Sequence, residues 1–380
     1  MRKATKFCLI LCLALLAAAC SSSANNDGPS SSATSGPSGS LSGTLGRASA
    51  AVKAAEAPPT DLGVTGELKS KPAPGGTIAW IECDSPTCVT ITIGVKQAAA
   101  ALGWHLDIIP FQLASAQTLI SALDQAYTDD PTFVIENGVP PVAFQSVVPE
   151  FAAKHIPIIV GYVGPTTIDS TIIANIGGPS ISHLWGKLLA EWVVADSNAN
   201  AHVLLATIPE IPILTTLGPA FKKELLALCS KCTYTEQDSS AADLPAGNIP
   251  GQVVSDIQRN PAINYVIFTV GDLATGVRAA LNAAGLNHVK IAGATPEVSD
   301  LQNLLDGSES AWTTLPLVWS GWAEIDCGLR HVEGMPVPAD CAAIPTQLLT
   351  SSNIKTINVS QPYVGVANFQ DKFKQLWRLG

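Results

Sequence analysis

Short apolar runs alternate with longer amphipathic segments along the chain from about residue 75 to residue 292. The apolar runs predict strands at residues 76–83, 104–111, 132–136, 156–161, 172–176, 202–208, 233–237, 265–270 and 289–292. The segments between them predict helices at residues 89–103, 116–127, 142–154, 181–196, 216–228, 252–259 and 272–285. Alternation of this kind is typical of α/β proteins with parallel sheets. Two series of similar length predict two similar lobes.

Most of the expected strands are apolar at nearly every position, as in Ile-Pro-Ile-Ile-Val at residues 156–160. Strands of this kind are covered by helices on both faces of their sheet. Ligands of such sheets bind beyond the carboxyl ends of the strands. The residues that follow the expected strands are therefore candidates for ligand binding: Glu82, Asp84, Glu136, Asn137, Tyr162, Pro209, Glu210, Gly271, Asp272, Thr295 and Pro296. Asp84 and Asp272 have an alternative role as helix caps.

The first 20 residues have the pattern of a secretion signal that ends in a lipobox. Basic residues come first, and the apolar run from Phe7 to Ala19 is shorter than the roughly 20 residues of a membrane-spanning helix. We expect cleavage before Cys20, lipidation of its thiol, and anchoring of the chain to the outer face of the cell membrane. Ala17 replaces the leucine common at this position of a lipobox, which leaves ordinary cleavage and secretion as the alternative.

Residues 21–74 are rich in Ser, Gly, Ala, Thr and Pro. Such a composition offers too little apolar surface to offset the entropy lost on ordering, so we expect a disordered tether. A helical patch at residues 48–57 is expected to order only locally.

The formal net charge of −10 argues against nucleic acid as a partner. No later apolar run reaches membrane-spanning length, so the chain is not expected to be a permease.

Six cysteines follow the expected signal and its Cys20. An even number in an oxidising compartment suggests disulfides, and local spacing favours, among 15 possible connectivities, the pairs Cys83–Cys88, Cys229–Cys232 and Cys327–Cys341. The spacing of Cys229 and Cys232 also occurs in thioredoxin-like proteins, but here the pair closes a helix instead of opening one. The six histidines show no zinc-ligand spacing, and no metal or cofactor is expected.

Several stretches between residues 76 and 329 resemble the type I periplasmic binding proteins of the ribose and galactose group, which share a fold with the effector domains of lactose-repressor relatives. The stretches are Ile-Glu-Cys-Asp-Ser-Pro-Thr-Cys-Val (81–89), residues 117–125, Ala-Ala-Lys-His-Ile-Pro-Ile-Ile-Val (152–160), Val-Gly-Asp-Leu-Ala-Thr-Gly-Val-Arg-Ala-Ala-Leu (270–281) and Val-Lys-Ile-Ala-Gly-Ala-Thr-Pro-Glu (289–297). Residues 369–377 are similar to the C-terminal end of actinobacterial members.

The resemblance implies two lobes joined by a three-segment hinge. The first lobe is expected at residues 75–176 and about 295–347, and the second at residues 177–294 and about 348–380. The crossovers are expected near Ile176, near Gly293 and at residues 347–357.

The chain departs from the sugar-binding members of this group at the positions that hold the sugar. Thr87 and Cys88 stand where two aromatic residues sandwich the ring, and Tyr162 and Val163 where an aspartate is often followed by arginine. The sugar-binding members have an arginine at the start of the helix that follows the strand at residues 203–208. In this chain that position falls near Thr215, which is not an arginine. Because charged groups satisfy sugar hydroxyls by multiple hydrogen bonds, these departures predict a less charged and more apolar pocket.

A tryptophan of the group Trp312, Trp319 and Trp322 could replace the missing aromatic residues, and Trp319 is the candidate for stacking on a ligand. The spacing of Trp319 and Trp322 is equally that of a helix face buried in the core.

We therefore expect a monomeric, lipid-anchored, extracytoplasmic solute-binding protein of an ABC importer, with a small sugar-like, or less polar aromatic or cyclic, solute and a membrane permease as its partners. The expected ligand-binding residues are Asp84, Thr87, Glu136, Asn137, Tyr162, Thr215, Asp272, Thr295 and Trp319. A lipoprotein that senses a ligand and reports to a membrane receptor is the alternative. An enzyme is less favoured: Glu82, Asp84 and Glu136 could supply a carboxylate pair for glycoside cleavage, but the chain has no nucleophile elbow and no phosphate-binding glycine loop.

Overall fold

The computed structural model describes residues 41–380. The expected signal peptide, the expected lipidation site Cys20 and the expected tether up to residue 40 lie outside the described residues. Within residues 41–380, no helix combines the length and the hydropathy that a membrane crossing requires.

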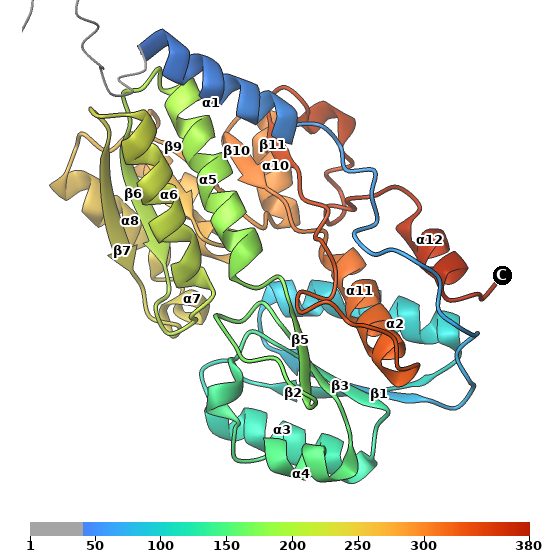
Figure 1. Cartoon of the computed structure of the whole chain (residues 1–380). Helices are drawn as coiled ribbons and strands as arrows, with labels where there is room; N and C mark the ends of the chain where they lie inside the picture. Colours follow the sequence, from blue (N-terminus) through green and yellow to red (C-terminus); the bar gives the residue numbers. More distant parts are fainter. Residues whose placement is uncertain (1–40) are drawn as a thin grey trace, which may run out of the picture. The chain divides into compact units, whose positions relative to one another are not determined.

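The first lobe is built on a sheet of five parallel strands in the order β2-β1-β3-β4-β5 (Figure 1). The strands are β1 (Thr77–Cys83), β2 (His105–Phe111), β3 (Phe133–Asn137), β4 (Ile158–Gly161) and β5 (Ile172–Ile176). The helices of this lobe are α2 (Pro86–Leu102), α3 (Ala116–Asp129), α4 (Val148–Lys154), α11 (Leu317–Val332) and α12 (Phe369–Leu376), with a short 3-10 helix η1 (Pro141–Ala143).

The second lobe has a six-stranded sheet in the order β11-β10-β9-β8-β6-β7, in which only the β10–β11 pair is antiparallel. The strands are β6 (His202–Thr207), β7 (Thr233–Asp238), β8 (Tyr265–Phe268), β9 (Lys290–Ala294), β10 (Ala311–Thr313) and β11 (Leu348–Thr350). The helices are α1 (Leu41–Ala55), α5 (Pro179–Asp196), α6 (Leu214–Leu228), α7 (Asp243–Ala246), α8 (Ile249–Arg259), α9 (Val277–Ala283) and α10 (Val298–Asp306), with the 3-10 helices η2 (Gly271–Ala274) and η3 (Ile354–Thr356).

Alternate residues of each central strand enter different hydrophobic cores. In β1, Ile78 and Trp80 pack with α2 and α11, whereas Ala79 and Ile81 pack with α3 and α4. In β6, alternate residues pack in the same way with α6 on one face and α8 on the other. Both faces of each sheet are therefore buried, as the uniformly apolar strands predicted. The predicted α/β fold with two lobes is confirmed.

The structure places the lobe boundaries differently from the sequence prediction. Helix α10 and strand β10 belong to the second lobe, because Leu301, Leu304 and Trp312 enter its core. Helix α12 belongs to the first lobe, because the rings of Phe369 and Phe373 pack against Trp322 of α11. Gly293 lies inside β9 and is not a crossover.

The chain passes from α1 in the second lobe to β1 in the first, and then between the lobes after β5, after β10, before β11 and again between β11 and α12. Two of these crossing segments are hydrogen-bonded to each other. The Thr314 N–H donates to the Gln347 carbonyl at 2.9 Å, and the Thr346 hydroxyl donates to the Thr314 carbonyl at 2.7 Å. These bonds hold the two segments together where the lobes meet.

Residues 41–74, which we call the N-terminal segment, pack against the folded part instead of forming the expected disordered tether. Helix α1 lies beside α5 (Figure 1), and Leu68 is fully buried. The indole N–H of Trp319 donates to the Leu62 carbonyl at 3.1 Å, and the Gln347 side chain donates to the Glu56 carbonyl at 2.7 Å. A few apolar residues and backbone groups thus order a stretch whose average composition resembles a linker.

Two expected helices are interrupted. Residues 142–154 form η1 and then α4, which begins with Val148 and Pro149, because proline lacks the N–H that a helix interior needs but suits the first turn. Residues 272–285 form η2 and then α9, because Gly276 between them has φ 79°, a left-handed conformation that ends a helix.

The six cysteines form the three disulfides that local spacing favoured. Cys229–Cys232 closes the end of α6, and Cys327–Cys341 ties α11 to the segment before β11.

Candidate functional site

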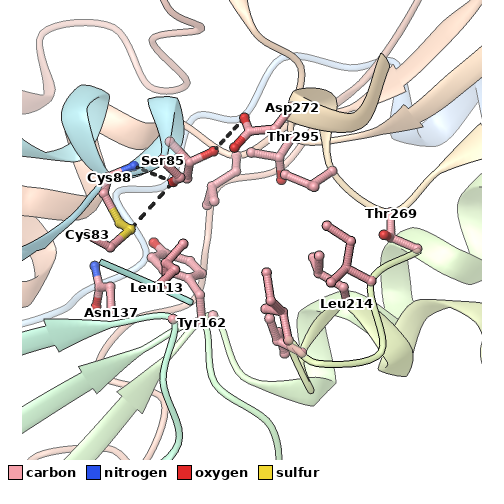
Figure 2. A pocket seen from close by; sticks show the side chains of 18 of the residues that line it. Cys83, Ser85, Cys88, Leu113, Asn137, Tyr162, Leu214, Thr269, Asp272 and Thr295 are labelled. Carbon is pink, nitrogen blue, oxygen red and sulfur yellow. Dashed lines mark hydrogen bonds between the residues drawn. A yellow bond between two sulfur atoms is a disulfide. The ribbon is translucent and has the colours of Figure 1, made fainter. Parts of the chain in front are cut away.

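A cavity of about 110 Å³ lies at the carboxyl ends of the strands and is lined by both lobes (Figure 2). One water molecule needs about 10–15 Å³ on the same measure, so the cavity admits a small organic molecule. A second cavity of about 300 Å³ adjoins it and shares seven of its lining residues. Ligands of parallel sheets bind beyond the carboxyl ends of the strands, which is where these cavities lie.

The wall of the first cavity is mainly aliphatic. Loop residues Ile208 to Leu214 contribute four apolar side chains from the end of β6, and Trp185 adds an indole from α5. The other apolar lining residues are Ile91, Leu113, Leu244, Val270, Leu273 and Leu315. The departures from the sugar-binding pattern predicted such a pocket.

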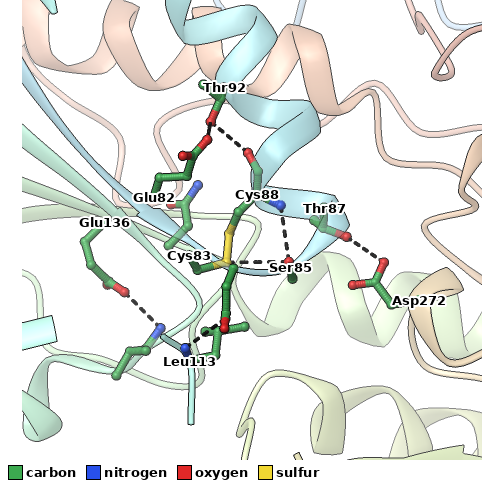
Figure 3. Close-up of a disulfide and its surroundings, with 12 residues drawn as sticks. Glu82, Cys83, Ser85, Thr87, Cys88, Thr92, Leu113, Glu136 and Asp272 are labelled. Atoms are coloured by element: carbon green, nitrogen blue, oxygen red, sulfur yellow. Dashed lines mark hydrogen bonds between the residues drawn. A yellow bond between two sulfur atoms is a disulfide. The ribbon is translucent and has the colours of Figure 1, made fainter. Parts of the chain in front are cut away.

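The Cys83–Cys88 disulfide forms part of the same wall (Figure 3). It joins the end of β1 to the first turn of α2, and Ser85 between the two cysteines caps this helix by accepting the N–H of Cys88 at 3.2 Å. Pro86 at the first helical position also favours a helix start here. The disulfide and the cap therefore fix the turn that carries Thr87.

Thr87 and Asp272 connect the two lobes across the cavity. The Thr87 hydroxyl donates to Oδ1 of Asp272 at 3.2 Å (Figure 3). Burial raises the pKa of Asp272, and hydrogen bonds from Glu297 and Thr87 oppose this rise. Burial and the neighbouring Asp272 raise the pKa of Glu297 to about 8, so Glu297 carries the proton of this pair at neutral pH.

Asn137 and Tyr162 provide polar groups from the first lobe, on the side of the cavity opposite Asp272 and Thr295 (Figure 2). Asn137 ends β3 and donates from Nδ2 to Oε1 of Glu324 at 2.8 Å. The Tyr162 hydroxyl donates to Ser320 at 2.7 Å. The Tyr162 ring packs directly against Gly177. A Cβ at position 177 would lie 2.2 Å from this ring, so only glycine fits here.

Tyr162 and Thr295 have φ 56° and φ 53°, in the left-handed region. This conformation is rare for side chains larger than Asn, and above all for a β-branched residue, and costs on the order of 1–3 kcal/mol. Both residues directly follow a parallel strand and both line the cavity. Backbone strain of this kind concentrates at functional sites, which supports the assignment of the cavity as one.

Two buried glutamates lie behind the first-lobe wall. Burial raises the pKa of Glu324 to about 8, and burial with the nearby Glu324 raises the pKa of Glu136 well above its usual value. A Cβ at Gly161 would lie 2.1 Å from Oδ1 of Asn137, so glycine here makes room for the contact between Asn137 and Glu324. Glu324 positions Asn137, Glu136 accepts the Val139 N–H at 3.1 Å, and neither acid lines the cavity.

The structure brings five of the nine expected ligand-binding residues together around the first cavity: Thr87, Asn137, Tyr162, Asp272 and Thr295. Asp84 lines the second cavity and accepts the Leu113 N–H at 3.0 Å. Glu136 is buried behind the wall, and Thr215 turns its hydroxyl to the Pro212 carbonyl. Trp319 lines neither cavity and is buried against Phe373, which is the alternative that its spacing left open.

The apolar lining residues were not among the expected site residues, because those were mainly the polar residues that follow the strands. The run Ile-Pro-Glu-Ile-Pro-Ile-Leu at residues 208–214 carried a signal, since so many aliphatic residues are unusual in a loop at a ligand-binding edge. Trp185 and Leu244 gave no local signal of their own. Within residues 41–380, no group of three His, Cys, Asp or Glu side chains is arranged to hold a metal ion.

Comparisons with known proteins agree with this architecture. Residues 82–334 match the family model of the periplasmic binding protein domain. Comparison with curated protein sequences gave no match.

Three solved structures illustrate the likeness in fold. GanP, a glucose-galactose binding protein from Geobacillus stearothermophilus, is 16% identical, with a TM-score of 0.64 over 74% of this chain and 99% of its own. A 5-methylthioribose transporter solute binding protein from Thermotoga lettingae is 14% identical, with a TM-score of 0.68 over 83% of this chain and 100% of its own. A carbohydrate transporter from Acidothermus cellulolyticus, in complex with myo-inositol, is 19% identical, with a TM-score of 0.62 over 74% and 96% of the two chains.

The family match covers about two thirds of the chain, from the end of β1 to the end of α11, and includes strands β2 to β10. It assigns the chain to binding proteins and not to enzymes. The chain belongs to the family of the periplasmic binding protein domain.

Proposed function

We propose that the protein is the extracytoplasmic solute-binding component of an ABC importer and captures a small organic solute between its two lobes. The observation that carries the proposal is the cavity at the carboxyl ends of both sheets, which residues of both lobes line. The family match and the solute-binding or transport names of the similar structures support it. A ligand there contacts both lobes only when they are closed, so it stabilises the closed state, which the permease then recognises.

The test of this proposal combines binding with uptake. A true ligand at 100 times its Kd is expected to stabilise the purified protein by about 2.7 kcal/mol, visible as a rise in Tm. Cells that lack the protein are expected to lose uptake of that compound, and the restored gene is expected to return it. Normal uptake together with loss of a cellular response to the compound would contradict import and indicate a sensor instead.

Lipid anchoring at Cys20 is part of the proposal and has its own test. Cys20→Ala is expected to move the protein from the membrane fraction to the soluble extracytoplasmic fraction, because Cys20 is the only cysteine at the lipobox position. Ligand binding is expected to stay unchanged, since the cavity is lined by residues far along the chain from Cys20. Cys12→Ala, inside the expected signal, is the matched control and should leave the protein in the membrane fraction. Retention of the Cys20→Ala protein in the membrane would contradict the lipid anchor.

A further inference from the structure

The charged side chains around the two adjoining cavities are all of one sign. Asp272 lines both cavities and Asp84 lines the second, whereas no lysine, arginine or histidine of the described residues 41–380 lines either of them. An anionic ligand would therefore enter a site that holds negative charge and offers no cation to pair with it.

The surroundings of Asp272 do not neutralise it. Its acidic neighbours are Glu297, to which it is hydrogen-bonded, and Asp300, whose pKa it helps to raise. Arg278, the cation near this acidic cluster, donates to the Val289 carbonyl and has Glu309 and Asp306 as its charged neighbours. The hydroxyl of Thr87 is the donor that the first lobe supplies to Asp272. Glu297 and the Asp272 backbone N–H also donate to this carboxylate, and of its roughly four lone-pair sites one is left to accept a donor from a ligand.

The rest of the wall cannot satisfy a polyol. A sugar or an inositol carries a hydroxyl on nearly every ring carbon, and each one loses water on entering the cavity. Opposite Asp272 the cavity offers the amide of Asn137, whose Nδ2 donates to Glu324 and whose Oδ1 is buried without a partner among residues 41–380, and the hydroxyl of Tyr162, which donates to Ser320. Between these polar ends the wall is mainly aliphatic, with the hydroxyls of Ser182 and Thr269 and the Cys83–Cys88 disulfide among the lining groups.

We propose that the site selects an uncharged or singly cationic compound with a mainly hydrocarbon body, whose hydroxyl or ammonium group donates to Asp272, and that it rejects carboxylates and polyols. This inference rests on the proposed function, since it names the solute class of the same cavity. The apolar body displaces water from the aliphatic wall, and the donor group pairs with the buried carboxylate.

Three probes with one hydrocarbon body and different end groups test the inference: 4-phenylbutan-1-ol, 4-phenylbutylamine and 4-phenylbutanoate. D-glucose and myo-inositol are the polyol probes. Isothermal titration of the purified protein at pH 7 is expected to show binding of the alcohol and the amine, each at least tenfold tighter than the carboxylate. Neither polyol is expected to bind in the same concentration range.

Asp272→Asn removes the charge and keeps the shape of the side chain. This variant is expected to bind the amine at least tenfold more weakly than the unaltered protein does. The difference in affinity between the alcohol and the carboxylate is expected to become smaller. Asp306→Asn removes an exposed carboxylate of the same lobe outside both cavities, and is the matched control that should bind all probes as the unaltered protein does. If Asp272→Asn does not fold, the order of probe affinities measured with the unaltered protein still tests the inference.

Tighter binding of 4-phenylbutanoate than of the alcohol, binding of a polyol in preference to the apolar probes, or binding of none of the apolar probes would each overturn the inference. Preference for glucose or inositol with matching uptake in cells would leave the proposed function intact. Binding of the alcohol or amine, with uptake of that compound unchanged in cells that lack the protein, would instead keep the inference and overturn the import function.

Discussion

Replacing Trp319 by alanine is expected to lower the free energy of unfolding by about 3–5 kcal/mol and to leave the ligand preference unchanged. The Trp319 ring is fully buried and packs against Phe373 with ring centroids 6.3 Å apart. Its indole N–H donates to the Leu62 carbonyl, so the variant also loses a contact that holds the N-terminal segment. Urea unfolding with a spectroscopic probe measures the first effect, and titration with the apolar probes measures the second.

Trp185→Phe is the matched comparison, because Trp185 lines the cavity and Trp319 does not. The smaller ring keeps most of the packing but loses the hydrogen bond to the Thr346 hydroxyl, for a stability loss of about 1 kcal/mol. We expect Trp185→Phe to change the affinity for the probes more than Trp319→Ala does. A tenfold loss of affinity in Trp319→Ala at unchanged stability would show that its ring contacts the ligand.

The contrast between these two tryptophans shows how far the sequence could predict the site. The spacing of Trp319 and Trp322 fitted a ligand platform and a core face equally well. Trp319 belongs to the core because it contacts Leu62 and Phe373. Both lie far from Trp319 along the chain, so the local sequence does not reveal these contacts. Trp185 contributes to the cavity because α5 starts directly after the crossover that follows β5.

The strands and the polar rim of the cavity were more predictable. Uniformly apolar strands must be buried on both faces, and residues that follow parallel strands must lie at one edge of the sheet. This reasoning found Asn137, Tyr162, Asp272 and Thr295. It could not place α12, because the aromatic contacts that fix this helix on α11 join residues about 50 positions apart.

The N-terminal segment shows the limit of composition as a guide. The average hydrophobicity of a long stretch decides whether it can form its own core. It does not show whether single residues of the stretch bind to a core formed by the rest of the chain. Leu68 enters an existing core, and Glu56 accepts hydrogen bonds from the hydroxyls of Thr350 and Ser352. A few such contacts suffice to order a stretch along a surface that is already folded.

Stability is expected to fall as the pH rises from 5 to 8.5, and Glu324→Gln is expected to reduce this dependence by the contribution of one buried acid. Glu324 is fully buried, and its Oε2 has no hydrogen-bond partner among residues 41–380. Burial raises its pKa in the folded state to about 8, against about 4.3 in an unfolded chain. The folded state therefore binds the proton more tightly than the unfolded state does.

The sign of the effect follows from this difference. The stabilisation by protonated Glu324 is fully present below the unfolded pKa and is lost as the pH rises through the folded pKa of about 8. The expected loss from this one group is roughly 2–4 kcal/mol. Glutamine cannot ionise, and its carbonyl oxygen can still accept the hydrogen bond from Nδ2 of Asn137. Glu297 and Asp300, whose pKa values burial raises to about 8 and about 9, keep a pH dependence of the same sign in the variant.

Tm measured by calorimetry at pH 5, 6, 7, 8 and 8.5 checks this prediction. The Tm of Glu324→Gln should exceed that of the unaltered protein at pH 8.5 by more than at pH 5. Glu150→Gln, which removes an exposed carboxylate on α4, is the control and should reproduce the unaltered pH profile. Parallel profiles for Glu324→Gln and the unaltered protein would mean that Glu324 is ionised in the folded state. The contact between Glu324 and Asn137 would then be that of a carboxylate with an amide, and Glu324 would hold a negative charge behind the cavity wall.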